Sequence, residues 1–419
     1  MSHFQILIIG GGTAGITVAA QLLRKNKNLK IGLIEPSDKH VYQPAWTLVG
    51  AGTYNYEDTI RNEADYIPNG VKWIKDKASD ILPNENKVAT ASSGDFNYDY
   101  LVIAPGLVMR PELLEGLPEA MKKDNVSSVY VDPVKAWKTL QNFKGGNALF
   151  TQPTTPIKCG GAPQKFLYLS EHYLRKQGIR GKSKMIYATP GSVIFGVQPF
   201  AKRLEEIIKE KDVVFRPFHR PVKIDAEKQE VVYQFDKEKF ENSPQSNLSN
   251  IGESYDKDNV HIPYDMLHLA PPQSAPEFIQ QFEVAVQEGN NKGWVDVDIY
   301  TLQHKRFGNI FALGDVAALP TAKTGAAIRK QAPVVVNNLL EMIQNNHLGN
   351  QLYQGYSSCP IVTGYGKMLL AEFKYENVRD SDPLISKFVD TSKEQYSMWL
   401  LKKYGLPFMY WNFMLKGMA

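Results

Sequence analysis

The sequence predicts an α/β protein with two domains, each built around a mainly parallel β-sheet. Residues 4–39 read as a buried strand, a glycine turn, an amphipathic helix and a second strand, which together make a complete βαβ unit. The stretch from Tyr98 to Gly106, with Tyr-Asp-Tyr-Leu leading to Ala-Pro-Gly, is echoed from Tyr264 to Pro272 by Tyr-Asp-Met-Leu leading to Ala-Pro-Pro. This echo indicates two copies of one supersecondary plan.

The composition excludes several classes of protein. The 419 residues are 43% hydrophobic and 22% charged, which suits a globular chain with enough core for two or three domains. No stretch reaches the roughly 18 to 20 uncharged apolar residues that span a bilayer, and because a strand pattern starts within the first few residues, no signal peptide is expected. A net charge of +4 predicts no nucleic-acid partner, and two cysteines make neither a disulfide scaffold nor a zinc site, so no metal is expected.

The glycine turn of the first βαβ unit has the spacing of a dinucleotide-binding turn. Gly10, Gly12 and Gly15 supply, in order, the tight turn, a close backbone approach to a pyrophosphate and the packing of helix on strand. Glu35 ends the second strand, 20 residues after Gly15, where a carboxylate accepts hydrogen bonds from ribose hydroxyls. The N-terminal part therefore predicts a Rossmann-like domain that binds an adenine dinucleotide.

Two later strands indicate which dinucleotide is bound. Tyr98 to Gly106 is a buried strand closed by Ala-Pro-Gly, and Asn309 to Pro320 is a strand that delivers Gly314 and Asp315 to a turn before a helix. Both resemble signatures of two-domain flavoproteins, in which the aspartate meets the ribitol of FAD. The N-terminus of the following helix would then stabilise the anionic reduced flavin. The alternative is that Asp315 simply caps a helix.

The second copy of the plan lacks its glycine turn. After a buried strand at Asn147 to Phe150 the chain reads TQPTTPIKCGGAPQK, with three prolines where a nicotinamide cofactor would need free backbone N–H groups. This departure predicts that neither NADH nor NADPH is the electron donor. The polar segment from Asp236 to Asp258 is expected to be a hairpin or loop inserted into this copy.

The two cysteines are candidate redox thiols. Cys159 stands where the nicotinamide site would have been, before a probable helix and close in sequence to Lys158 and Lys165. A helix N-terminus and lysines lower a thiol pKa and favour the thiolate. Cys359 lies 200 residues later, and the sequence leaves open whether the two thiols meet or are unrelated small buried residues.

Eight motifs together resemble the sulfide:quinone oxidoreductase family, and within it the branch that includes the mitochondrial enzymes. The resemblance runs from residue 4 to about residue 416. The motifs are GGGTAG with Glu35, YQPAWTLVGAG, LVIAPG, TPIKCGGAPQK, GWVDVD, LGD, LPTAKTGAA and SSCPIVTGYGKMLLAEF. The resemblance implies a glutathione-reductase-like flavoprotein fold, that is, two Rossmann-like domains followed by a C-terminal amphipathic membrane-binding segment.

The resemblance also implies the site and its chemistry. Hydrogen sulfide would attack a Cys159–Cys359 disulfide, FAD would receive two electrons, and ubiquinone or menaquinone would take them away. Cys359 would carry the persulfide, and Cys159 would contact the flavin. A small sulfur acceptor such as sulfite, glutathione, coenzyme A or cyanide would remove the sulfane sulfur. The implied FAD-binding residues are Gly10, Gly12, Thr13, Ala14, Gly15, Glu35, Gln43, Ala104, Pro105, Gly106, Gly314, Asp315, Lys323 and Thr324.

The last 24 residues, from Tyr396, have an unusual composition, with seven aromatic residues, four methionines, three lysines and no acid. Pro407 is expected to break them into two pieces of roughly ten residues, too short to span a bilayer but suited to its surface. Lys402, Lys403 and Lys416 would then face anionic lipid. A helix packed on the core, or a homodimer contact, are the alternatives.

These observations predict the organisation of the chain. Residues 1–115 and 291–345 would form the FAD-binding domain, residues 116–290 the second Rossmann-like domain, and residues 346–419 a C-terminal region with the second cysteine and the membrane-binding helices. The expected location is the cytoplasmic face of a bacterial plasma membrane. The alternative functions are a type 2 NADH:quinone oxidoreductase, a flavocytochrome-type sulfide dehydrogenase, and a non-catalytic flavoprotein.

Overall fold

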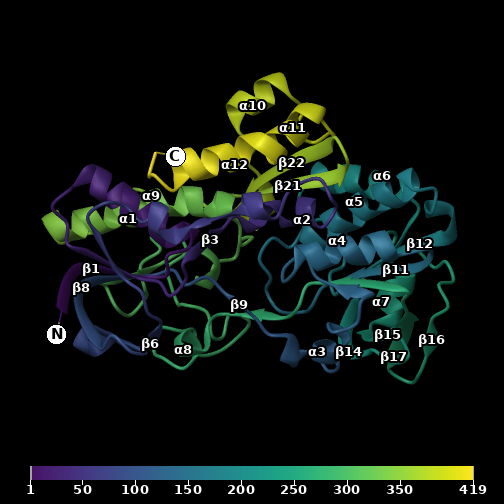
Figure 1. Ribbon diagram of the computed structural model, residues 1–419, viewed down its shortest axis with the longest axis horizontal. Helices are drawn as coiled ribbons and strands as arrows, with labels where there is room; N and C mark the ends of the chain where they lie inside the picture. Colours follow the sequence, from purple (N-terminus) through teal and green to yellow (C-terminus); the bar gives the residue numbers. More distant parts are fainter. Residues whose placement is uncertain (1, 419) are drawn as a thin grey trace.

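The computed structural model describes residues 2–418 and contains two large sheets with a C-terminal layer across them (Figure 1). The first sheet has the order β5-β2-β1-β8-β7-β6, and β20 also pairs with β8. Its strands are β1 (Ser2–Ile9), β2 (Ile31–Ile34), β5 (Val71–Ile74), β6 (Ala78–Leu82), β7 (Lys87–Thr90), β8 (Asp95–Ile103) and β20 (Ile310–Ala312). The pairs β2–β5, β1–β2, β1–β8 and β8–β20 are parallel, as the βαβ pattern predicts.

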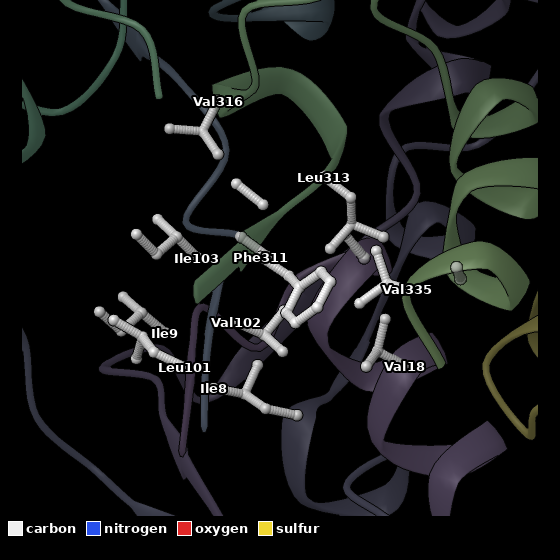
Figure 2. Close-up of a cluster of buried hydrophobic side chains, with 14 of the residues drawn as sticks. Ile8, Ile9, Val18, Leu101, Val102, Ile103, Phe311, Leu313, Val316 and Val335 are labelled. Atoms are coloured by element: carbon white, nitrogen blue, oxygen red, sulfur yellow. The ribbon is translucent and has the colours of Figure 1, made fainter. Parts of the chain in front are cut away.

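The core of this half forms between the sheet and two helices, α1 (Thr13–Lys25) and α9 (Gly325–Asn345). Figure 2 shows Phe311 of β20 beside Val102 of β8, with Val18 of α1 and Val335 of α9 facing them. All four side chains are buried. The central parallel strands end in buried apolar runs, such as 6–9 of β1 and 101–103 of β8, because both faces of a parallel sheet are covered.

The second sheet, on the right in Figure 1, repeats the plan in the order β10-β18-β11-β12-β13. Its strands are β10 (Val126–Ser127), β11 (Gly146–Thr151), β12 (Ser183–Ala188), β13 (Val213–Arg216) and β18 (Met266–Leu269), and its helices are α4 (Pro133–Asn142), α5 (Ala162–Lys176) and α6 (Phe200–Glu210). Strand β18 pairs in parallel with β11 just as β8 pairs with β1. The internal echo in the sequence is therefore confirmed as a repeated strand arrangement.

A smaller antiparallel sheet lies beside the second sheet. Its order is β14-β15-β17-β16, from β14 (His219–Asp225), β15 (Glu230–Phe235), β16 (Ser254–Tyr255) and β17 (Asn259–Pro263). The polar segment from Asp236 to Asp258 carries helix α7 (Lys237–Asn242) and the edge strand β16. The remaining short elements are β3 (Lys39–Val41), α2 (Trp46–Val49), β4 (Ile60–Asn62), β9 (Val108–Met109), α3 (Leu117–Ala120), β19 (Gln273–Ser274) and α8 (Glu277–Gln280).

The C-terminal layer begins with a three-stranded sheet of β21 (Ser357–Gly364), β22 (Lys367–Lys374) and β23 (Val378–Arg379), followed by α10 (Pro383–Phe388). Consecutive helical turns follow: α11 (Tyr396–Leu400), the π-helical turn η9 (Leu401–Gly405), α12 (Leu406–Met409) and the π-helical turn η10 (Tyr410–Met414). In Figure 1 this yellow segment lies along the top, next to α9 and β22. Among the described residues, no helix is both long enough and apolar enough to cross a membrane.

The helical run does not break at Pro407, so the expected division into two pieces is wrong. The N–H of Leu406 bonds to the carbonyl of Leu401, five residues back, so the π-helical turn changes the register immediately before the proline. Pro407 then occupies the first turn of α12, where its missing N–H costs little. One continuous helical segment therefore runs from Tyr396 to Met414, and we refer to it as the C-terminal helix.

Candidate active site

A cavity of about 570 Å³ runs from the glycine turn after β1 to the C-terminal helix. Most of the residues expected to hold FAD line it, namely Gly12, Thr13, Ala14, Glu35, Gln43, Ala104, Pro105, Gly106, Asp315, Lys323 and Thr324. Cys159 lines the same cavity. The three other expected residues, Gly10, Gly15 and Gly314, do not line it.

Gly10 and Gly15 shape the turn from behind the cavity wall. Gly10 has φ +100°, and a Cβ added at Gly15 would stand 1.9 Å from the carbonyl oxygen of Gly10. Both positions therefore exclude a side chain. At Gly12, by contrast, an added Cβ would meet no protein atom within 4 Å, so the backbone is open to the cavity.

The groups around the glycine turn fit an adenine dinucleotide. Helix α1 begins at Thr13 and directs its unpaired N–H groups towards this end of the cavity, which suits a pyrophosphate. Glu35 accepts hydrogen bonds from the Gly11 and Ser37 N–H groups, both at 2.7 Å. Burial raises the pKa of Glu35, and the nearby Glu63 adds to this effect. The site is thus open and donor-rich where the cofactor's phosphates would lie and acidic where its ribose would lie.

Another part of the cavity wall is formed by the turn after β20 and the start of α9. Lys323 donates to the carbonyl oxygens of Asp315 at 2.7 Å and Ala317 at 3.0 Å, and its ammonium lies 4.0 Å from the Trp294 ring centroid. Burial lowers the pKa of Lys323 to about 8. Thr324 caps α9 by accepting from the Ala327 N–H, which leaves the helix N-terminus at the cavity. This positive end suits a cofactor that becomes anionic on reduction.

Cys159 is held at the cavity wall in a left-handed backbone conformation, with φ +48°. Its N–H donates to the Lys323 carbonyl at 2.9 Å, and its carbonyl accepts from the Tyr130 hydroxyl at 2.9 Å. Helix α5 begins three residues later, at Ala162. Hydrogen bonds therefore tie this strained residue to Lys323 in the first half of the molecule and to Tyr130 in the second half.

Cys359 lies on β21 and meets Cys159 across the start of α5. Its side chain is buried, and its sulfur would stand 2.7 Å from a Cβ added at Gly161. Only a glycine therefore lets α5 approach the strand this closely. The two cysteines are free thiols and hydrogen-bond partners, so residues 200 positions apart in the chain form a dithiol.

Two buried lysines surround the dithiol. Lys165 is 2% exposed, and its Nζ lies 3.1 Å from Cys159 Sγ. The hydrogen bond from Cys359 and the charges of Lys165 and Lys402 hold the pKa of Cys159 well below its usual range, although burial opposes them. The pKa of Cys359 is raised by its hydrogen bond to Cys159 and by burial. In the reduced state the negative charge therefore rests on Cys159.

The sequence predicted that Lys402 faces lipid, and this prediction is wrong. Lys402 is 4% exposed and donates to the carbonyl of Pro44 at 2.8 Å. Burial and the charge of Lys165 lower its pKa to about 7, while the two thiols oppose that shift. The C-terminal helix thus carries a cation into the active site. The three-lysine, acid-free tail was a signal for this residue, but the sequence did not show which way each lysine points.

Several other cavity residues were missed or left open by the sequence. The cavity is lined by Trp46, Pro44 and Tyr410, whose roles the sequence left open, and by Tyr130 and His40, which sequence reasoning did not assign. The Lys158 ammonium donates a hydrogen bond to the side-chain carbonyl of Gln43. His172 stacks on Tyr365, away from the cavity.

Comparison with known proteins agrees with this geometry. Residues 4–142 match the pyridine nucleotide-disulphide oxidoreductase family. The chain is 42% identical over 418 residues to the mitochondrial sulfide:quinone oxidoreductase of Mus musculus, covering 99% of this chain and 87% of that one. The corresponding protein of Dictyostelium discoideum is 41% identical over 421 residues, with 99% and 86% covered.

Among solved structures, the sulfide:quinone oxidoreductase of Aquifex aeolicus superimposes with a TM-score of 0.78 at 22% identity, covering 100% of this chain and 93% of that one. This similarity supports the flavoprotein fold. FAD is the cofactor that such proteins bind, and the open, donor-rich cavity fits it. Given the near-complete coverage at up to 42% identity, the chain belongs to the sulfide:quinone oxidoreductase family.

Proposed function

We propose that this flavin-dependent oxidoreductase oxidises hydrogen sulfide to sulfane sulfur and passes two electrons through a Cys159–Cys359 disulfide and FAD to ubiquinone or menaquinone. One observation carries the proposal: the two thiols are in contact at the wall of the cofactor cavity, with Lys165 Nζ 3.1 Å from Cys159 Sγ. The relatives named above carry the same activity in their names.

The first step is attack of hydrosulfide on Cys359 Sγ in the disulfide state. A sulfur–sulfur bond to Cys359 forms, the Cys159–Cys359 bond breaks, and its electron pair leaves on Cys159 as the thiolate. The position of Cys159 supports this assignment, because Cys159 lines the cavity and its sulfur lies beside Lys165. The ammonium groups of Lys165 and Lys402 stabilise the leaving thiolate.

The second step restores the disulfide. A small sulfur acceptor, such as sulfite, glutathione, coenzyme A or cyanide, attacks the outer sulfur of the persulfide and leaves a thiolate on Cys359. Bound FAD supplies a two-electron acceptor beside the dithiol and a donor to the quinone. Re-formation of the disulfide releases two electrons, which is the number that a quinone takes up with two protons to become a quinol.

We further propose that the C-terminal helix lies on a membrane surface and receives the quinone there. Leu401, Leu406, Met409 and Met414 of this helix line the cavity, while Phe408 and Phe413 are exposed on it. An apolar end of the cavity thus lies next to an apolar surface, which suits a lipid-dissolved substrate. The expected bacterial plasma membrane has no support among the similar proteins reported above from Mus musculus and Dictyostelium discoideum, whose names describe them as mitochondrial.

The test is an anaerobic titration of the purified protein with sodium sulfide in the presence of sulfite as the sulfur acceptor, and then with a short-chain ubiquinone. Sulfide should bleach the flavin absorbance, with a long-wavelength band from the Cys159 thiolate, and quinone should restore it. In Cys159→Ser and Cys359→Ser, sulfide should leave the flavin oxidised, while dithionite, which needs no dithiol, should still reduce it. Sulfide-dependent bleaching in both variants would overturn the proposed route of the electrons, and failure of quinone to restore the absorbance would overturn the acceptor.

A further inference from the structure

A buried chain of polar side chains connects the C-terminal helix to the glycine-turn end of the cavity. The hydroxyl of Tyr410 lies 2.7 Å from Thr13 Oγ1 and 2.6 Å from His40 Nε2, and His40 Nδ1 lies 3.0 Å from Glu63 Oε2. Tyr410, His40 and Glu63 are each at most 6% exposed, and all four residues line the cavity. The active-site mechanism proposed above uses none of them.

The hydrogen bonds of this chain fit one direction. A carboxylate only accepts, so the His40 Nδ1–H donates to Glu63, and with this hydrogen on Nδ1 the Nε2 atom accepts from the Tyr410 hydroxyl. Burial raises the pKa of Tyr410 well above its usual range, which keeps that hydroxyl protonated. Its oxygen is then free to accept from Thr13, the first residue of α1. Every donor between the C-terminal helix and Glu63 is used.

One acceptor remains unused at the end of the chain. Glu63 Oε1 is buried and has no partner in the described part of the molecule. A Cβ added at Gly11 would stand 2.6 Å from this oxygen and 2.6 Å from Cγ of Glu35, so the two carboxylates converge on one point of the glycine turn. A buried carboxylate oxygen without a donor costs free energy, and the cavity beside it is where a donor can enter.

The chemistry of the missing donor is restricted. Two neighbouring carboxylates repel a phosphate, so the group that meets Glu63 is not the pyrophosphate. It must present hydroxyl or amino hydrogens, and a ribose offers two adjacent hydroxyls. We infer that Glu63 is a second acidic contact to the adenosine ribose of FAD beside Glu35, and that His40 and Tyr410 make this contact depend on docking of the C-terminal helix.

The antiparallel pairing of β3 with β4 supports this role, because it brings His40 and Glu63 together. His40 lies on β3, and Glu63 follows β4 directly, with its N–H donating to the Asp38 carbonyl at 2.9 Å. The ring of Tyr410 also packs on Tyr42, with centroids 4.7 Å apart. The strand pair therefore fixes the position of Glu63 locally. Of the hydrogen-bonded residues Tyr410, His40 and Glu63, Tyr410 comes from a distant part of the sequence, the C-terminal helix.

The test measures how fast FAD leaves the holoenzyme, which does not depend on sulfide or quinone. Release is followed by the fluorescence of free FAD after dilution. Glu63→Gln and Tyr410→Phe should each release FAD at least about tenfold faster, since a hydrogen bond to a charged group is lost or loosened. The controls are Glu57→Gln, an exposed acid close by in sequence, and Tyr404→Phe, an exposed tyrosine of the same helix.

A second measurement separates a ribose contact from general damage. FAD with a 2′-deoxy- or 3′-deoxyadenosine moiety is bound to the apo-protein in place of FAD. At least one analogue should bind the wild type more weakly than FAD does, and this penalty should shrink in Glu63→Gln. An equal penalty in both proteins would overturn the ribose contact, and unchanged FAD release from Tyr410→Phe would overturn the coupling to the helix. If Glu63→Gln does not fold, release from Tyr410→Phe decides, because it removes one oxygen only.

Discussion

Lys165 is a cation buried next to a thiol, and the two groups change each other's protonation. Cys159 and Cys359 hold the Lys165 ammonium charged, although burial opposes this. In return the ammonium favours the thiolate of Cys159. A buried ion pair of this kind contributes little net stability, so its value lies in the reactivity of the sulfur.

We expect Lys165→Met to raise the pKa of Cys159 in the reduced protein. Thiolate, the reactive form, exists above the thiol pKa, so the pH profile of Cys159 alkylation by iodoacetamide should move to higher pH by at least about one unit. Mass spectrometry of the modified peptide measures the rate between pH 5 and pH 9. Lys176→Met, which removes an exposed lysine from the same helix, should leave the profile in place. Superimposable profiles for Lys165→Met and wild type would show that this lysine does not control the thiol.

At the level of single residues, the sequence identifies the reactive groups but does not show which side chains surround them. Both cysteines stand out because glycine or proline follows each of them in the sequence, but their contact depends on β21 packing against α5. The orientation of Lys402 was not predictable because it depends on the rotation of the C-terminal helix, which two π-helical turns alter. Similarly, Glu63 and Tyr410 meet only through His40, and no local pattern connects them.

The C-terminal helix has two different faces. Lys402 and Tyr410 point inwards to the active site, whereas Tyr404, Phe408 and Phe413 are 40% or more exposed. The rings of Phe408 and Phe413 lie 5.8 Å apart and form one aromatic surface. The inner face of the helix therefore completes the cavity, and the exposed outer face is the one that we propose meets lipid.

We expect the double variant Phe408→Ser/Phe413→Ser to bind membranes at least about tenfold more weakly, since burying each phenyl ring in lipid is worth roughly 1.5 to 3 kcal/mol. Cosedimentation with phosphatidylcholine–phosphatidylglycerol vesicles measures the binding. The control is Leu113→Ser/Leu248→Ser, which removes two exposed leucines outside this helix. Equal cosedimentation of both double variants would argue against a membrane role, and a change in oligomeric state would instead assign the aromatic surface to a dimer contact.

At the scale of the whole molecule, the repeated plan was predictable because strand periodicity and the two echoed segments are local signals. The β8 and β18 segments occupy equivalent places in their sheets. What the sequence could not give is how the halves share the site. The loop that replaces the second glycine turn crosses to the first half. There the backbone of Lys158 forms a parallel β-bridge with that of Lys323, and the Cys159 N–H donates to the Lys323 carbonyl.

This crossing loop leads to our prediction for the electron donor. In the second half, the backbone that follows β11 is committed to the dithiol, and its prolines Pro153 and Pro156 lack the N–H groups that a pyrophosphate needs. We therefore expect NADH at millimolar concentration to leave the flavin oxidised in anaerobic stopped-flow experiments, while sulfide reduces it in the same preparation. NADH should also fail to slow the reaction with sulfide, because neither the loop nor the dithiol forms a binding site for its pyrophosphate. Rapid bleaching by NADH would instead indicate a type 2 NADH:quinone oxidoreductase, and would show that the crossing loop does not exclude the nucleotide.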